Sequence, residues 1–216
     1  MRVELPTGTP AELVRVDGAE RGLVLIPDIM GLRPLFDDHV ARIATGQGWT
    51  VCAPQLFAGR EHLTVEERMA AAAELVDQQV LADVSAAADA TGCSTVVVTG
   101  FCMGGMYAIK ASATGRFHRA AAFYGMIRLP EHWRGPGQSE PLELLAGGDP
   151  CPLLAIVGTQ DPFTPAADVA ALEEAGAVIV SYEDANHGFV HDPDRPTHRP
   201  KDAADAWARA IEFLSA

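Results

Sequence analysis

The chain has 216 residues, 48% of them hydrophobic and 21% charged, which is ordinary globular composition. Its 29 acidic residues outnumber 16 basic ones, and the resulting net charge of −13 argues against nucleic acid or an anionic membrane as a partner. The N-terminal segment lacks the apolar stretch of a secretory signal, and no apolar run approaches the ~18 residues of a membrane span. We therefore expect a cytoplasmic protein, monomeric or homodimeric, with a single domain over 1–216 and a small molecule as its partner.

Short apolar runs predict the strands. Segments 2–5 and 11–17 alternate apolar and polar residues, which favours an antiparallel hairpin at a sheet edge. The later runs are continuous, mostly bounded by Gly or Pro, and typical of strands buried on both faces of a parallel sheet. These runs cover 23–27, 50–54, 94–100, 120–125, 153–158 and 177–183.

Helical patterns separate these strands. A capping-box pair, Thr64 and Glu67, opens an Ala-rich helix expected to run over 64–92. The segment 127–150 is rich in Gly and Pro and is expected to be irregular. Strands that alternate with helices predict an α/β fold, a mostly parallel doubly wound sheet with helices on both faces. The other expected helices cover 34–48, 103–115, 164–176 and 201–216.

Chemically active side chains follow several of the expected strands. Ligands bind at the carboxyl ends of the strands in open α/β sheets, so we expect these side chains to meet at one rim. Each alone has a plainer interpretation: a packing turn at the cysteine, a turn or helix cap at an aspartate, a loop imidazole at the histidine. Their joint occurrence favours a shared site. The residues are Asp28, Cys102, Asp161 and His187.

The segment GFCMGG around Cys102 matches the G-x-nucleophile-x-G elbow of α/β hydrolases, and the order nucleophile, acid, histidine is also theirs. Gly100 and Gly104 flank the cysteine because side chains there would collide with the strand and helix that the bend joins. The start of the following helix favours a thiolate at Cys102. The amides of Met103 and Ile29 are expected to bind an oxyanion.

The sequence offers little support for metal or cofactor chemistry. The Pro-rich segment that holds His187, His191 and His198 lacks the helix that would bring histidines together on a metal, so we expect no metal site. No nucleotide-binding glycine motif follows a strand, so no cofactor is expected. The other cysteines are interpreted as small buried hydrophobes in a reducing compartment: Cys52, Cys93 and Cys151.

From about Gly22 to the C-terminus, the chain resembles the dienelactone hydrolase family of α/β hydrolases. The resemblance implies that Cys102 is the nucleophile, with His187 as general base and acid. It also implies that Asp161 orients the imidazole and that the substrate is an unsaturated lactone bearing a carboxylate. The motifs that carry it are PDIMGL (27–32), APQLF (53–57), GFCMGG, VGTQDPFTP (157–165), NHGF and the tail DRPTHRPKDAADAWARAIEFL.

The sequence departs from the family pattern near the expected substrate. Asp28 stands where the family has a glutamate that contacts the resting thiol, and the resemblance implies the same contact here. Where the lactone hydrolases have an arginine beyond the catalytic histidine, this chain has His191, whereas an arginine after the QLF motif is kept in kind as Arg60. The candidate substrate-binding residues are Arg60, Phe101, Tyr124 and His191.

These features predict a hydrolase that opens a small lactone or cleaves a small ester through a Cys–His–Asp triad and a thioester acyl-enzyme. Two alternatives keep the same scaffold. One is a redox-responsive or binding protein that uses Cys102 without hydrolysis. The other is an esterase or acyltransferase whose substrate is unrelated to dienelactones.

Overall fold

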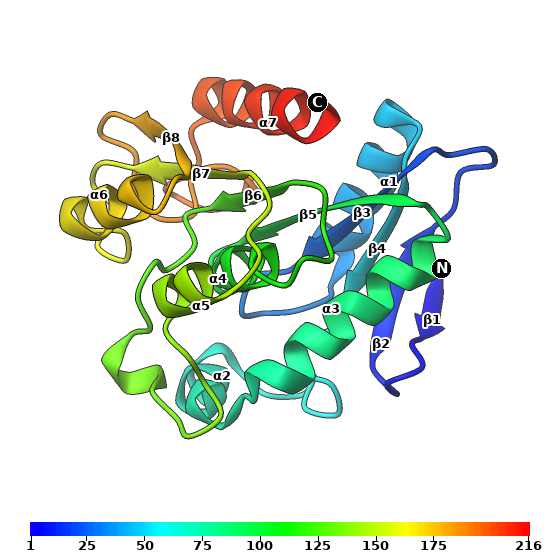
Figure 1. Cartoon of the computed structure of the whole chain (residues 1–216), viewed down its shortest axis with the longest axis horizontal. Coiled ribbons are helices and arrows are strands. Elements are labelled where there is room, and N and C mark those ends of the chain that lie inside the picture. Colours follow the sequence, from blue (N-terminus) through cyan, green and yellow to red (C-terminus); the bar gives the residue numbers. More distant parts are fainter.

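Eight strands form one continuous sheet through the centre of the molecule (Figure 1). The structure is a computed structural model and describes residues 1–216. The order across the sheet is β1-β2-β4-β3-β5-β6-β7-β8. The strands are Arg2–Glu4 (β1), Pro10–Val14 (β2), Arg21–Ile26 (β3), Thr50–Pro54 (β4), Thr95–Phe101 (β5), Ala120–Phe123 (β6), Leu153–Gly158 (β7) and Val178–Tyr182 (β8).

The strand directions follow the sequence pattern. β1 pairs antiparallel with β2 and β2 antiparallel with β4, whereas all other neighbouring strands are parallel. The expected edge hairpin and the mostly parallel, doubly wound α/β sheet are therefore confirmed. The winding reverses beside β3 and β5, and a crevice at the carboxyl ends of such strands is where open α/β sheets bind ligands.

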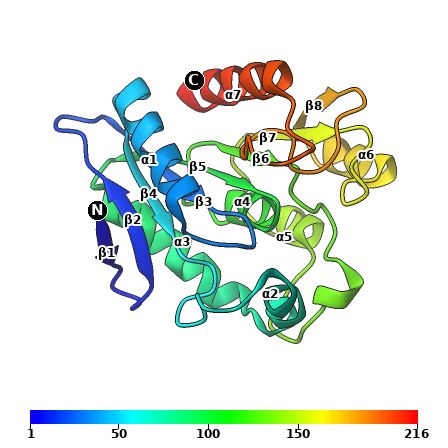
Figure 2. The same cartoon turned by 180° about the vertical axis from the view of Figure 1, so that it is seen from behind.

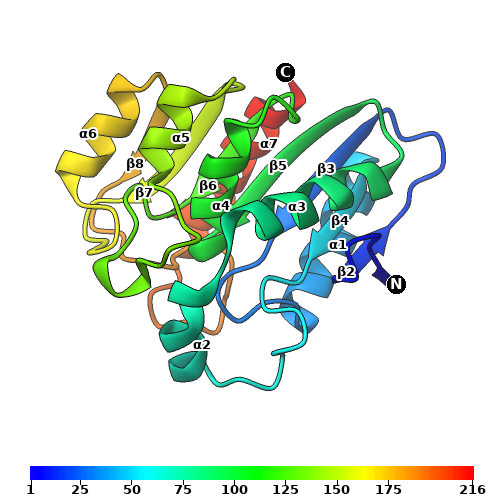
Figure 3. The ribbon, with the colours of Figure 1, turned by 60° about the horizontal axis from the view of Figure 1, so that its bottom comes forward.

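Helices cover both faces of the sheet (Figures 2 and 3). The apolar side chains of α1 and α7 pack on one face, and those of α3, α4 and α6 pack on the other. None of the helices has the length and apolar character that crossing a bilayer requires. The helices are Pro34–Gln47 (α1), Val65–Ala71 (α2), Asp77–Thr91 (α3), Met103–Ser112 (α4), Pro141–Gly147 (α5), Ala166–Glu174 (α6) and Pro200–Ser215 (α7), with 3₁₀ turns at Ala72–Glu74 and Glu131–Trp133.

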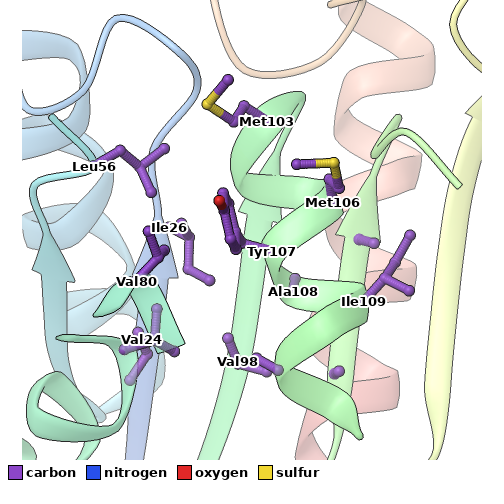
Figure 4. Close-up of a cluster of buried hydrophobic side chains, with 14 of the residues drawn as sticks. Val24, Ile26, Leu56, Val80, Val98, Met103, Met106, Tyr107, Ala108 and Ile109 are labelled. Atoms are coloured by element: carbon purple, nitrogen blue, oxygen red, sulfur yellow. The ribbon is translucent and has the colours of Figure 1, made fainter. Parts of the chain in front are cut away.

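Helix α4 is buried along its whole length. Figure 4 shows Tyr107 of this helix facing Ile26 of β3, with Val80 of α3 and Val98 of β5 in the same cluster. Each fully buried side chain of this size contributes about 1.5–3 kcal/mol relative to an exposed one. This packing holds the N-terminus of α4 in a fixed place at the carboxyl edge of the sheet.

The unbroken helix expected over 64–92 is wrong. The capping box is present, but the chain becomes extended at Val76, and a separate helix begins at Asp77. The Asp77 amide donates to the carbonyl of Gly137, and its carboxylate accepts from the buried Lys110 ammonium of α4 at 2.8 Å. These long-range contacts fix the start of α3 as a separate helix, and helix propensity contains no signal for them.

The segment 127–150 is also more ordered than expected, because it contains α5. Pro141 lies in the first turn of this helix, where its missing N–H has no intrahelical acceptor. Leu145 of α5 is buried in the same apolar cluster as α4. Other apolar side chains of the segment 127–150, such as Leu129 and Trp133, are buried in this cluster as well, so the segment packs on the core at several points.

Candidate active site

Cys102 lies on the tight bend between β5 and α4. Its φ of 55° and ψ of −117° are strained for a residue with a side chain, at a cost of about 1–3 kcal/mol. A Cβ on Gly100 would overlap the backbone of Gly104, and one on Gly104 would overlap the carbonyls of Ile26 and Pro27. Both glycines are therefore required by the close approach of backbone to backbone, as the motif predicts.

The register of the sheet brings the candidate residues to one edge. Ile26 of β3 pairs with Gly100 of β5, so Asp28 and Cys102 leave the sheet side by side. In the same way Gly158 of β7 pairs with Tyr182 of β8, just before the loops that carry the acid and the histidine. The structure therefore brings the expected nucleophile, acid and histidine together.

His187 is held between the acid and the thiol. Its Nδ1 lies 2.8 Å from Oδ2 of the buried Asp161. The other Asp161 oxygen accepts from the amide of Phe163 at 2.8 Å, which fixes the carboxylate. Cys102 lies close enough to the same imidazole to raise its pKa. With the proton on Nδ1 directed at Asp161, Nε2 is the nitrogen left for the sulfur.

The electrostatics of the site favour a charged imidazole. Burial works against the imidazolium, but the hydrogen bond that the ring donates to Asp161, the charge of that carboxylate and the neighbouring Cys102 outweigh it and raise the pKa of His187 to about 9. At neutral pH the ring is therefore protonated.

Two backbone amides near Cys102 lack acceptors within the chain. Met103 is the first residue of α4, and its N–H precedes the first hydrogen bond of the helix. The Ile29 N–H lies in the loop after β3 and has no acceptor within the chain. The carbonyl of the same peptide group, on Asp28, is held by the amide of Gly31 at 2.8 Å. Both amides are available to an incoming oxygen.

Asp28 does not use its carboxylate on the thiol in this structure. Its Oδ1 accepts from the Met30 amide and from Arg33, and its Oδ2 accepts from Arg33 and from Nε2 of His191, all at 2.7–3.0 Å. Burial opposes the charge, but the His191 and Arg33 contacts outweigh it and lower the pKa of Asp28. The contact with Cys102 that the resemblance implies is replaced by this ion-pair network, because one methylene fewer keeps the carboxylate close to its own loop.

The four candidate substrate-binding residues have partners within the protein. Phe101, Tyr124 and His191 are almost completely buried, and they belong to one aromatic cluster on the α1 and α7 side of the sheet. All three pack as core residues, and their contact with substrate stays a prediction. Arg60 forms an ion pair with Glu74 at 2.7 Å and packs over a phenylalanine ring.

Three residues around the site were not predicted from the sequence. Phe163 is 41% exposed, and its ring centroid lies 4.9 Å from that of His187. Met30 is 38% exposed in the loop that carries Ile29. Met30 lies within the PDIMGL motif and Phe163 within VGTQDPFTP, and that position is a signal for both. The buried Arg68, whose Nη1 donates to the Ile29 carbonyl at 3.3 Å, had no such signal because it sits in a helix of ordinary composition.

The other three cysteines and His191 have partners other than His187. Burial raises the pKa of Cys52 to about 12 and that of Cys151 to about 11, which keeps both as thiols at neutral pH. Cys93 is partly buried and donates to the Ala19 carbonyl. His191 is turned towards Asp28, whereas His187 is turned towards Asp161. These two histidines therefore face different carboxylates.

Sequence comparison identifies relatives over nearly the whole chain. The model of the dienelactone hydrolase family matches residues 10–216. A carboxymethylenebutenolidase from Rhodococcus opacus is 29% identical over 209 residues, which cover 91% of this chain and 81% of that protein.

Solved structures share the architecture. A crystal structure named as a "Putative Dienelactone Hydrolase" from Klebsiella pneumoniae superposes with a TM-score of 0.87 at 24% identity, over 100% of this chain and 97% of that one. A dienelactone hydrolase-like promiscuous phosphotriesterase from metagenomic libraries superposes with a TM-score of 0.77 at 18% identity, over 100% and 96% of the two chains. At these identities the structural likeness speaks for the fold.

Proposed function

The chain belongs to the dienelactone hydrolase family of ester and lactone hydrolases, and from that premise we propose that it opens a small lactone or cleaves a small ester through a thioester on Cys102. In this proposal His187 is the general acid and base, and Asp161 orients it. The amides of Ile29 and Met103 bind the oxyanion.

The observation that carries this proposal is the position of His187. Its Nδ1 bonds to Asp161 at 2.8 Å while the ring also interacts with Cys102 on a strained elbow. A redox sensor needs a reactive thiol but has no use for an aligned acid and imidazole. An ordered acid–imidazole–thiol series is what acyl transfer requires.

The first half of the reaction acylates the cysteine. The thiolate sulfur forms a bond to the carbonyl carbon, and the carbonyl electron pair becomes an oxyanion held by the Ile29 and Met103 amides. When this intermediate collapses, the bond from carbon to the leaving oxygen breaks. The His187 imidazolium gives its proton to that oxygen, and the products are a thioester and an alcohol or, from a lactone, an enol or alcohol on the same molecule.

The second half regenerates the enzyme. The now neutral His187 takes a proton from water, and the hydroxide attacks the thioester carbon. The carbon–sulfur bond breaks, the acid leaves, and the thiolate and imidazolium are restored. Asp161 stabilises the imidazolium at both stages and keeps the proton on Nδ1.

The substrate class follows from the relatives and from the mouth of the site. The Rhodococcus relative is named for a butenolide bearing a carboxymethylene group, and we propose an enol lactone of this kind as the first substrate to test. The partly exposed ring of Phe163 lies 4.9 Å from that of His187, and this apolar neighbour suits a flat, mostly apolar ring.

The test is turnover with matched variants. We expect wild-type enzyme to hydrolyse p-nitrophenyl acetate and at least one enol lactone, and Cys102→Ala to lose at least ~1000-fold in kcat while keeping its far-UV and near-UV circular dichroism. Cys52→Ala is the control, since this buried thiol is remote from the site and should leave kcat unchanged. Wild-type activity in Cys102→Ala, or in His187→Ala, would contradict the proposal.

A further inference from the structure

Asp28 is a buried carboxylate whose hydrogen-bonding capacity is fully used. A carboxylate has about four acceptor positions, two on each oxygen. On Oδ1 they are taken by the Met30 amide at 3.0 Å and Arg33 Nη1 at 2.7 Å. On Oδ2 they are taken by Arg33 Nη2 and His191 Nε2, each at 2.9 Å. No position is left to accept a hydrogen bond from a thiol.

These bonds shape the loop that presents the Ile29 amide. The Asp28 side chain accepts from the Met30 amide, and its own carbonyl accepts from the Gly31 amide at 2.8 Å, with Gly31 at a φ of 66°. The loop is thus a tight turn closed by side chain and main chain at once. The peptide group between Asp28 and Ile29 is held by its carbonyl, and its N–H is left free.

The carboxylate is itself anchored from two other strand ends. His191 donates from Nε2 to Asp28, and its Nδ1 lies 2.5 Å from the Tyr124 hydroxyl, which follows β6. The backbone of His191 is fixed as well, because its amide donates to the same hydroxyl and its carbonyl lies 2.7 Å from His39 Nε2. All of these side chains are buried. The neutral tautomer with the proton on Nε2 satisfies every one of these bonds.

We propose that Asp28 is a positioning residue that fixes the Ile29 peptide as an oxyanion donor, with His191 and Tyr124 as its anchor. The inference rests on the proposed function. It assigns the carboxylate to transition-state stabilisation, through the loop, and removes it from any contact with the resting thiol.

Two reactions of Cys102 separate these roles. Acylation by p-nitrophenyl acetate builds an oxyanion and needs the Ile29 amide, whereas alkylation by iodoacetamide builds none and depends on the thiolate alone. A carboxylate that positions the oxyanion loop affects the first reaction only. A carboxylate that acts on the thiol affects both, and a purely structural residue changes stability without changing the ratio of the two rates.

Asp28→Asn is the principal variant. Its amide nitrogen replaces an oxygen that accepts hydrogen bonds, so the turn or its anchor loses a partner. We expect the acylation rate constant from the p-nitrophenol burst to fall ~30- to 300-fold, within the range known for loss of an oxyanion donor. The second-order rate constant and the pH profile of Cys102 alkylation should stay within about threefold of wild type.

Tyr124→Phe gives a milder test should Asp28→Asn fail to fold. It removes one hydroxyl and keeps the ring, so we expect a ~5- to 20-fold loss in acylation with unchanged alkylation. Tyr107→Phe is the matched control: it removes a hydroxyl from another fully buried tyrosine, on the opposite face of the sheet, and should change neither rate.

The outcomes are distinct. A parallel fall in acylation and alkylation, or a shifted alkylation profile, would overturn the positioning role in favour of an action on the thiol. Unchanged acylation in both variants, measured on folded protein, would leave the network as packing and overturn it too. If wild-type Cys102 is alkylated but never acylated by any ester or lactone, the proposed function itself fails, and the positioning role falls with it.

Discussion

At the scale of single residues, the site depends on how charge is placed around His187. The Asp161 carboxylate is buried and fixed by a backbone amide. Its electrostatic attraction for the imidazolium is therefore only weakly screened by solvent. Burial alone would keep the ring neutral. The raised pKa of His187 shows that the acid and the thiol together decide its charge.

The pH dependence of turnover follows from this residue. The imidazolium must be present to protonate the leaving oxygen, so kcat/KM should fall as the pH rises through about 9, the pKa of His187. In Asp161→Asn the main hydrogen bond that raises this pKa is lost, so the alkaline limb should move to lower pH and kcat should fall ~100- to 10,000-fold. Stopped-flow acylation across pH 5–10.5 measures both effects. A limb that stays in place in Asp161→Asn would show that another group titrates there.

At the level of secondary-structure elements, the bend at Cys102 depends on close backbone contact between β5 and α4. β5 and α4 approach so closely that their glycine backbones touch, and α4 in turn lies against the carbonyls at the end of β3. The strain at Cys102 is held by the burial of α4 along its length. Packing energy from the helix therefore maintains an unfavourable conformation at Cys102, the residue that precedes it.

Gly104→Ala tests this arrangement. The added Cβ would overlap the carbonyls of Ile26 and Pro27, and because these are backbone atoms of a central strand they cannot move aside cheaply. We expect a loss of roughly 2–4 kcal/mol in the free energy of unfolding by urea, as for overpacked cores, and loss of esterase activity. Gly46→Ala in α1 is the control. Nothing lies within 4 Å of its added Cβ, so it should be neutral or stabilise by up to about 1 kcal/mol. Equal effects at the two positions would contradict the packing argument.

At the scale of the whole molecule, two apolar clusters on opposite faces of one sheet support residues that come from four strand ends. The segment 127–150, between β6 and β7, also bonds to a buried ion pair of the helices that cover the sheet. Lys110 of α4 bonds both oxygens of Asp77, and the amide of Ser139 in this segment donates to the same carboxylate. Helices α3 and α4 and the segment thus share a single charged contact.

Removing one charge of this ion pair should lower the free energy of unfolding more than replacing both residues with apolar ones. Asp77→Leu leaves the fully buried ammonium of Lys110 without its partner, and we expect a loss of about 3–5 kcal/mol in the free energy of unfolding. In the double variant Asp77→Leu with Lys110→Met both charges are gone, so most of that loss should be recovered. Urea unfolding of the single and double variants measures the coupling. Additive losses would show that the two charges do not depend on each other.

The sequence by itself determined the fold class, the strands and the residues of the elbow. Continuous apolar runs, glycines around Cys102 and the order of nucleophile, acid and histidine are local or ordinal features, and parallel strand ends must share an edge. Membership of the family follows from the same motifs. Each of these depends on neighbours along the chain or on the general geometry of α/β sheets.

Only the tertiary structure decided which partner each buried polar group takes. Asp28 could have turned to the thiol, but Arg33 and His191 hold it at its own loop. The long Ala-rich helix could have continued, but Asp77 is drawn to Lys110 from a distant segment. A buried charge must find its partner in space, and the free energy of that pairing depends on distances that residue order does not encode.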